Sequence, residues 1–368
     1  MTDTTIFGGY DGDPKNSDLH YEELRVRLER TAKRVAAAYK EDAKEISRLL
    51  VSDLSELWRL DERDQSRRRL AEQTAELVQR RLRTLQNPQH CHAARRLACH
   101  IIKCGFGCQV HHAAYCLIVA YAMERTLVFS DSTLNYADTR WDEVFQPLSN
   151  TCSDLHTSDF PGARTDRLVV RLGAARGFLA HTPFHPPAVP ADLLPTVRLF
   201  HGAPHAWWVG QVLSYLMRLQ PRSDQLVKAV LGRLNFTRPI VGIHVRRSDK
   251  LIHEAEYHAV DEYMAAVEDI YETLEITNGG GARKIYVATD DVSVFDEINK
   301  KYPDYTVIGD RNISSRASGK TKYSKEALDG ILVDIHLLSM CDFVVCTFSS
   351  NCLVAKVVCR EERCVRRS

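Results

Sequence analysis

The chain has 368 residues, of which 44% are hydrophobic and 26% charged, and its formal net charge is +1. This length allows more than one domain with its own core, and the composition is that of an ordinary globular protein. The nearly neutral charge excludes a global field that would attract nucleic acid or an anionic membrane, so any anionic ligand must be bound by a local cluster. The longest apolar run, Tyr115 to Met123, is far shorter than the ~20 residues that span a bilayer and is expected to be buried core.

The N-terminal quarter of the chain is predicted to be a polar leader followed by helices. Residues 1–18 form the leader, which has no signal-peptide apolar region and is expected to be disordered. In residues 19–86, one apolar stripe runs from Leu24 to Leu57 and a second helical pattern runs from Leu70 to Leu85. Together they predict a helical hairpin or short coiled coil used for packing or oligomerisation.

Residues 87–235 are predicted to form a mixed α/β subdomain that is rich in cysteine. Five of the 11 cysteines lie between residues 91 and 116, and Cys152 follows. The sequence Cys104-Gly-Phe-Gly-Cys108 has the form of half a zinc site, but no second pair follows at zinc-finger spacing. A small disulfide framework is the better interpretation, and it indicates an oxidising compartment. The helices expected here cover 108–124 and 207–219, and the strand expected between them covers 126–129.

After Pro239 the pattern changes to strands that alternate with helices. Such alternation predicts a parallel sheet of the Rossmann-like kind, in which ligands bind beyond the carboxyl ends of the strands. The side chains just after each strand are therefore the candidates for a site. Strands are expected at 240–245, 284–289, 305–308 and 343–347, with helices at 263–274, from about 290 to 302 and at 324–340.

The first of these strands runs into His244-Val-Arg246-Arg247-Ser-Asp249-Lys250, with Glu254 close behind. Two adjacent guanidinium groups can bind one pyrophosphate and stabilise the negative charge that develops on a departing diphosphate. The structural alternative is a surface ion-pair network with Asp249. Glu254 beside Lys250 suggests a general base with its partner, although a helical salt bridge is the usual meaning of this spacing.

Four further polar residues are also candidates. The pair Asp290-Asp291 follows the second strand, and one adjacent pair is a poor magnesium cage, so hydrogen bonding or capping of the next helix is expected instead. Asp334 lies on an apolar helix and would suit the paired N–H groups of guanine, although an ordinary solvent-facing carboxylate is the simpler interpretation. Ser350 follows the last strand.

Several long motifs resemble the α-1,6-fucosyltransferases that modify N-glycan cores, glycosyltransferase family 23. The resemblance covers roughly residues 20–352 and extends upstream to the cysteine-rich region. The motifs that carry it are His244-Val-Arg-Arg-Ser-Asp-Lys250, Tyr286-Val-Ala-Thr-Asp-Asp291, Asp334-Ile-His-Leu-Leu-Ser339, Val345-Cys-Thr-Phe-Ser-Ser350, Glu76-Leu-Val-Gln-Arg-Arg81 and Cys104-Gly-Phe-Gly-Cys-Gln-Val-His-His112.

The resemblance implies a GT-B-like glycosyltransferase of the α/β class, with a Rossmann-like GDP-fucose-binding subdomain at residues 236–356 after the N-terminal coiled coil. It implies inverting transfer of fucose from GDP-fucose to O6 of the innermost GlcNAc of N-glycans, without a metal. It also implies residence in the Golgi lumen, homodimerisation through the N-terminal helices and no nucleic-acid partner. The alternatives are a catalytically dead truncated product that at most dimerises, or another GDP-fucose-dependent O-fucosyltransferase.

By the same resemblance, each candidate residue has an expected role. Arg246 and Arg247 would bind the diphosphate together with Ser350, and His244 and Asp334 would contact guanine. Glu254 would be the catalytic base, assisted by Lys250, and the remaining polar residues would position donor or acceptor. Those remaining residues are Asp249, Tyr263, Asp290 and Asp291.

The resemblance also implies four disulfides and an end to the similarity near residue 356. The expected pairs are Cys91–Cys152, Cys99–Cys116, Cys104–Cys108 and Cys346–Cys352, although Cys352 comes one residue earlier than the corresponding cysteine of the family. Residues 357–368 form a divergent tail, so the donor subdomain is expected to be incomplete and the family's SH3 domain to be missing. The family's N-terminal membrane anchor is expected to be missing as well.

Overall fold

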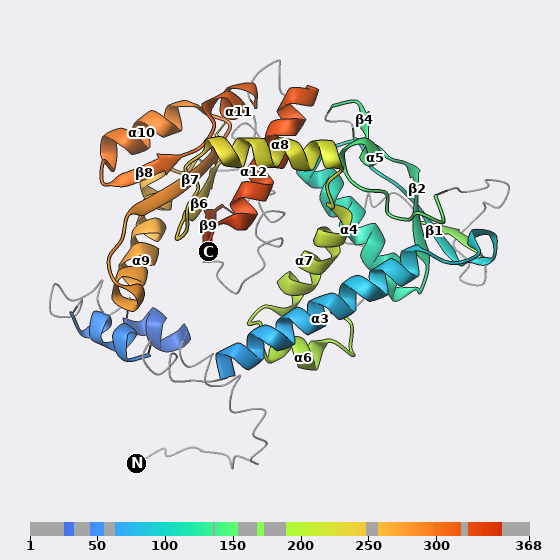
Figure 1. Cartoon of the computed structure of the whole chain (residues 1–368), viewed down its shortest axis with the longest axis horizontal. Helices are drawn as coiled ribbons and strands as arrows, with labels where there is room; N and C mark the ends of the chain where they lie inside the picture. The colour runs from blue at the N-terminus through green and yellow to red at the C-terminus, as the bar shows by residue number, and fades with distance from the viewer. Residues whose placement is uncertain are drawn as a thin grey trace, which may run out of the picture.

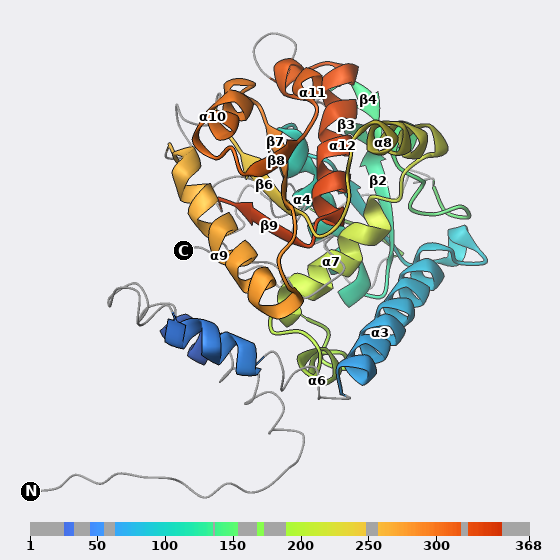
Figure 2. The same ribbon diagram turned by 60° about the vertical axis from the view of Figure 1, so that its left-hand side comes forward.

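The computed structural model describes residues 26–32, 45–54, 63–134, 137–153, 168–172, 189–247, 257–317 and 323–347. Two α/β units lie side by side, each built around a parallel sheet, as the two views in Figures 1 and 2 show. Helical segments at 26–32 and 45–54 precede them. In the part of the chain that the structure describes, no helix is long and apolar enough to cross a membrane.

The first unit contains a parallel sheet in the order β2-β1-β5 and a short antiparallel pair, β3 with β4. Helix α4 is almost wholly apolar and most of its residues are buried, which is typical of a helix at the centre of a core. The elements are α3 (Arg63–Gln86), η1 (Cys91–Ala93), β1 (Arg96–His100), α4 (Phe106–Ala122), β2 (Thr126–Asp131), β3 (Thr133–Leu134), β4 (Thr139–Arg140), α5 (Trp141–Val144), β5 (Val169–Arg171), α6 (Leu194–Arg198) and α7 (Pro204–Leu216).

The second unit contains a four-stranded parallel sheet in the order β8-β7-β6-β9. The alternating side chains of β7 enter two different cores, because Ile285 and Val287 pack against α9 and α10 whereas Tyr286 and Ala288 pack against α8 and α12. Helices therefore cover both faces of this sheet, as in a Rossmann-like unit. The elements are α8 (Pro221–Arg233), β6 (Val241–Val245), α9 (Val260–Asn278), β7 (Arg283–Thr289), α10 (Ser293–Lys301), β8 (Tyr305–Ile308), α11 (Arg311–Arg316), α12 (Lys325–Met340) and β9 (Phe343–Cys346).

Helix α12 connects the two units and approaches the sheet closely. Its residues Leu328 and Leu332 belong to the core of the first unit, and Leu338 belongs to the second. At Gly242 in β6, a Cβ atom would lie 2.8 Å from Leu338 Cδ2 and 2.9 Å from Cys341 Sγ. The absence of a side chain at this position lets the helix pack directly on the strand.

The helix expected near Leu70 to Leu85 is confirmed and extends over Arg63–Gln86 as α3. Val78 and Leu82 of α3 are fully buried in the core of the first unit, and the helix runs beside α6 and α7 (Figures 1 and 2). Helix α3 is thus part of the globular structure. Its pairing with the upstream helices in a hairpin or coiled coil stays a prediction.

Three of the cysteine pairs implied by the resemblance are within bonding distance. The S–S distances are 1.98 Å for Cys91–Cys152, 1.94 Å for Cys99–Cys116 and 2.12 Å for Cys104–Cys108. For the fourth pair, Cys346 is buried in β9 and Cys352 lies outside the described residues.

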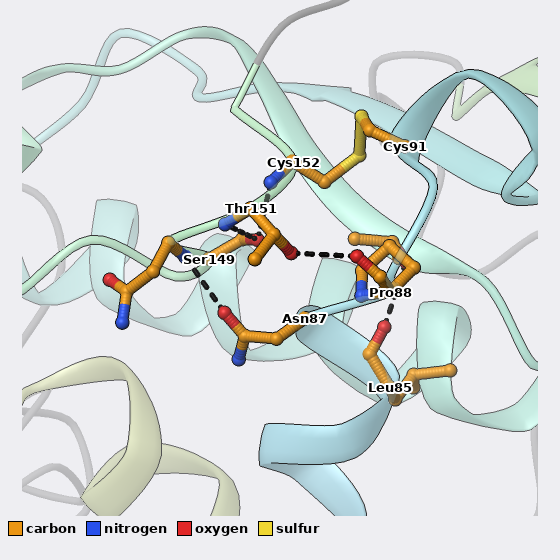
Figure 3. The surroundings of a disulfide bond; sticks show 9 residues. Leu85, Asn87, Pro88, Cys91, Ser149, Thr151 and Cys152 are labelled. Carbon is orange, nitrogen blue, oxygen red and sulfur yellow. Dashed lines mark hydrogen bonds between the residues drawn. A yellow bond between two sulfur atoms is a disulfide. The ribbon is translucent and has the colours of Figure 1, made fainter.

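The Cys91–Cys152 pair fastens the segment at residues 149–152 to the end of α3 (Figure 3). Asn87 Oδ1 accepts a hydrogen bond from the Asn150 amide at 2.8 Å, and the Thr151 hydroxyl donates to the Pro88 carbonyl at 2.9 Å. The carbonyl of Leu85, in the last turn of α3, accepts from the Thr126 hydroxyl at 2.7 Å. These bonds anchor the helix end to the start of β2 and to the disulfide loop.

Candidate active site

The adjacent arginines lie at the carboxyl edge of the second sheet. Strands β6 and β7 are parallel and in register, with Val245 opposite Thr289, so the residues that follow each strand emerge at the same edge. Arg246 therefore meets Asp290. The sequence prediction that polar groups after separate strands converge is confirmed for this pair.

The carboxylate of Asp290 contacts both arginines, one through its guanidinium and the other through its backbone amide. Its side chain is only 2% exposed, and its Oδ2 lies 3.2 Å from Arg246 Nε. Its Oδ1 accepts a hydrogen bond from the backbone amide of Arg247 at 2.8 Å. One buried carboxylate thus orients the first guanidinium and fixes the backbone that carries the second.

Arg247 is enclosed in a network of its own. Its guanidinium donates to Glu297 at 2.9 Å, lies 3.6 Å from Asp291 and stacks over the Tyr257 ring at 5.1 Å. Burial alone would lower the pKa of Arg247, but the hydrogen bond to Glu297 together with the nearby charges of Glu297 and Asp291 raises it. The Arg247 side chain is 10% exposed against 21% for Arg246, so Arg247 is the more buried of the two cations.

Of the aspartate pair, Asp291 contacts the start of α10, whose N-cap residue is Val292. Asp291 Oδ1 accepts from the amide and the hydroxyl of Ser293 at the start of α10, at 2.9 and 2.6 Å. Burial would raise the pKa of Asp291, but the bonds from Ser293 together with the Arg247 guanidinium lower it, so the group is a carboxylate at neutral pH. Both aspartates contact Arg247, but Asp290 also pairs with Arg246, whereas Asp291 binds the start of α10.

Asp334 and His244 lie on the face of the sheet that α12 covers. Asp334 Oδ1 accepts a hydrogen bond from the Tyr286 hydroxyl at 2.7 Å, and the side chain is partly exposed. The surrounding protein raises the pKa of Asp334 to about 7, because desolvation disfavours the charged form. His244 is half-buried in β6, on the same face as Tyr286. Asp334 is thus partly exposed and has a defined hydrogen-bond partner in Tyr286.

Tyr263 lies on the opposite face, in α9, and is 4% exposed. Its hydroxyl bonds to Thr347, directly after β9, and burial raises its pKa. The ring meets His258 edge to face, with centroids 6.4 Å apart. Tyr263 thereby connects α9 to the carboxyl end of β9.

Four candidates lie outside the described residues: Asp249, Lys250, Glu254 and Ser350. The ion pair considered between Asp249 and the arginines falls outside them as well. The roles expected for these four residues stay predictions.

Sequence reasoning assigned no role to Tyr286 or Glu297. For Tyr286 a signal existed, because a tyrosine in an inner strand needs a hydrogen-bond partner for its hydroxyl. For Glu297 none existed, since it is 50 residues away from Arg247 and its position in α10 becomes meaningful only when α10 packs beside the end of β6.

A possible metal-ligand group occurs in the first unit, away from the arginines. Among the described residues, the side chains of Cys99, His112 and Cys116 are near enough to one another to share an ion, and all are buried. The two sulfur atoms are bonded to each other, and His112 Nε2 lies 3.7 Å from each. Both thiols are thus used by the disulfide.

Comparisons with known proteins identify the family. Residues 15–360 match the family model described as alpha-(1,6)-fucosyltransferase N- and catalytic domains. A curated alpha-(1,6)-fucosyltransferase of Drosophila melanogaster is 46% identical over 84% of this chain, and one of Caenorhabditis elegans is 37% identical over 73%. The matches cover 51% and 49% of those proteins, so the chain spans about half the length of the curated relatives it matches.

Solved structures give a more distant similarity. The NodZ α-1,6-fucosyltransferase co-crystallised with GDP matches 72% of this chain and 91% of its own, at 14% identity and a TM-score of 0.43. On the family model and the two curated relatives, the chain belongs to the alpha-(1,6)-fucosyltransferase family.

Proposed function

We propose that the protein transfers fucose from GDP-fucose to O6 of the innermost GlcNAc of an N-glycan, with inversion at the anomeric carbon. Family membership and the names of the two curated relatives support this reaction. The observation that carries it is the Arg246 guanidinium at the carboxyl edge of the second sheet, oriented by buried Asp290. A fixed cation at this edge suits a diphosphate leaving group.

In the proposed reaction, Arg246 binds the β-phosphate and Arg247 lies beside it, with Ser350 as a further diphosphate ligand. The bond between the fucose anomeric carbon and the diphosphate oxygen breaks, and negative charge accumulates on GDP. A cation that is already oriented stabilises this charge without reorganisation during the reaction. Asp290 positions Arg246, and Asp291 positions Arg247.

Glu254 is proposed to remove the proton from the acceptor O6, which then attacks the anomeric carbon from the opposite side. A nearby Lys250 keeps this carboxylate ionised and ready to act as base. Asp249 and Tyr263 position donor or acceptor. The base and the arginines would lie on opposite sides of the reacting carbon, as inversion requires.

His244 and Asp334 are proposed to bind the guanine base. A carboxylate can accept from both N1–H and the 2-amino group of guanine, a pair of parallel donors. The two residues share one face of the sheet, and their strand and helix are in contact through Gly242 and Leu338.

Further parts of the proposal concern the setting of the reaction. The donor is handled by cationic side chains without a metal, the protein works in the Golgi lumen and the N-terminal helices form a homodimer. The disulfides of the first unit agree with an oxidising compartment. The two alternatives, an inactive dimerisation module and another O-fucosyltransferase, gain no support from the relatives.

The test is a transfer assay with the full chain, GDP-fucose and an N-glycopeptide, with and without EDTA, read by mass spectrometry with fragmentation. We expect one fucose on the innermost GlcNAc in both arms. Glu254→Gln should bind GDP normally but transfer no fucose, because only proton removal is lost. Absence of transfer by the unsubstituted protein contradicts the proposal, and loss with EDTA alone contradicts metal independence.

A further inference from the structure

A fully buried tyrosine, Tyr286, contacts Asp334, the carboxylate proposed to bind guanine. Tyr286 has a relative exposure of 0% and occupies the middle of β7, the second strand in the order β8-β7-β6-β9. Its ring packs edge to face with Phe236 at 5.8 Å between centroids, which leaves the hydroxyl as its polar end. That hydroxyl donates to Asp334 Oδ1 at 2.7 Å.

The position of Asp334 along α12 explains why this bond matters for a ligand. Leu338, one helical turn later, packs on Gly242 in β6. Only two residues separate α12 from β9, so the helix runs antiparallel to the strands, and Asp334 is one turn nearer the carboxyl edge than Leu338. Tyr286, which is fully buried, therefore supports the carboxylate from the interior, and the Asp334 side chain remains partly exposed.

We propose that Tyr286 is a positioning residue that fixes the Asp334 carboxylate as the acceptor for the paired N–H donors of guanine. The inference rests on the proposed function, since it concerns the same donor site. The tyrosine restricts rotation of the carboxylate and stabilises its charged form by donating to it. Without this donor, the carboxylate is freer to turn, and it takes up a proton more readily.

Burial and a nearby charge both disfavour the ionised form of Asp334, and Tyr286 opposes them. Desolvation raises the pKa of Asp334 most, the hydrogen bond from Tyr286 of β7 lowers it, and the charge of Asp310 at the start of α11 raises it further. Asp310 is itself paired with Arg233 of α8 at 3.5 Å, and its Oδ1 accepts from the Asn312 amide. His244 of β6 lies on the same sheet face. Of Asp310, Arg233, His244 and Tyr286, it is Tyr286 that donates a hydrogen bond directly to Asp334.

The experiment measures the affinity of the full chain for GDP and for inosine diphosphate, which lacks the 2-amino group, by calorimetry between pH 5.5 and 8.5. Tyr286→Phe should weaken GDP binding about 10-fold near neutral pH, as loss of a bond to a charged group predicts. The preference for GDP over inosine diphosphate should shrink, and the decline in affinity on acidification should begin at a higher pH. A merely structural role would not move this pH profile.

Tyr215→Phe is the matched control, because Tyr215 is also buried and its hydroxyl donates to the Leu148 carbonyl at 2.7 Å in the first unit. It should leave GDP affinity and its pH profile unchanged. In an Asp334→Asn background, Tyr286→Phe should cause no further loss of GDP affinity, because the carboxylate it positions is gone.

If Tyr286→Phe does not fold, 3-fluorotyrosine incorporated at position 286 replaces it. This ring keeps the hydroxyl but donates more strongly, so the decline in GDP affinity should move to lower pH. An unchanged profile and an unchanged GDP preference in either variant overturn the inference alone. Absence of GDP binding by the unsubstituted protein overturns the proposed function, and the inference with it.

Discussion

Substitution of Gly242 by alanine tests how closely α12 packs on the second sheet. The added methyl group would lie 2.8 Å from Leu338 Cδ2 and 2.9 Å from Cys341 Sγ, both shorter than a normal van der Waals contact. Overpacking of this kind costs about 1–3 kcal/mol, and the lower entropy of the unfolded alanine chain returns about 0.5–1 kcal/mol. We expect Gly242→Ala to lower the free energy of unfolding by about 1–2 kcal/mol.

The assay is urea denaturation followed by circular dichroism, with Gly232→Ala in α8 as the control. Among the described residues, and apart from its chain neighbours and the helix's own backbone, nothing lies within 4 Å of a Cβ at Gly232, so alanine there should stabilise the helix by about 0.5–1 kcal/mol. Leu338→Ala should lower the free energy of unfolding less in the Gly242→Ala background than alone, because it removes the Leu338 Cδ2 methyl group that crowds the new alanine. A Gly242→Ala protein as stable as its parent would refute the close approach of α12.

Three further predictions concern stability. The folded-state pKa of Asp334, about 7, lies above the ordinary value of 3.8, so the free energy of unfolding should fall as pH rises through this window. Asp334→Asn avoids this loss, so its free energy of unfolding should gain about 2 kcal/mol over that of the parent between about pH 4 and pH 7. Equal pH profiles of stability in the two proteins would contradict this. Asp290→Ala should destabilise the fold by about 2–4 kcal/mol in urea titrations, because Arg246 loses its buried partner, and a loss below about 0.5 kcal/mol would show that the pair is immaterial. Replacing Cys91 and Cys152 together by serine should cost about 2–5 kcal/mol under oxidising conditions, with no difference once the parent is reduced.

Most of the second sheet could be predicted from the sequence. Strands β6, β7, β8 and β9 agree with the predicted ranges within one residue, because each is a short apolar run bounded by polar or turn residues. Helix α12 begins at Lys325 after the capping residue Ser324, which accepts from the Ala327 amide, and this boundary too was predicted. Strong local signals and tertiary structure agree in this unit.

The first unit was predicted less completely. Strand β1 escaped prediction because Arg96–His100 is only five residues long and begins with an arginine, although Arg96 is 3% exposed in the structure. Its pairing with β2 and β5 is a tertiary fact that alternation of side chains does not reveal. Helix α4, by contrast, is a long apolar segment and was predicted within two residues at each end.

The sequence could predict which residues gather at the site, but few of the contacts between them. The meeting of Arg246 with Asp290 could be predicted, because each follows a strand and parallel strands share a carboxyl edge. The contacts of Arg247 with Glu297 and of Asp334 with Tyr286 join residues about 50 apart in the chain, and only packing of α10 and α12 creates them.

The most direct test of the central claim is a calorimetric titration of the full chain with GDP, comparing the parent with Arg246→Ala. Loss of one guanidinium–phosphate contact should weaken GDP binding about 10- to 100-fold. Arg222→Ala removes an exposed ion-paired arginine of α8, 3.6 Å from Asp329, and should leave the affinity unchanged. Wild-type affinity in the Arg246→Ala protein would contradict the claim that the cation at the end of β6 holds the leaving diphosphate.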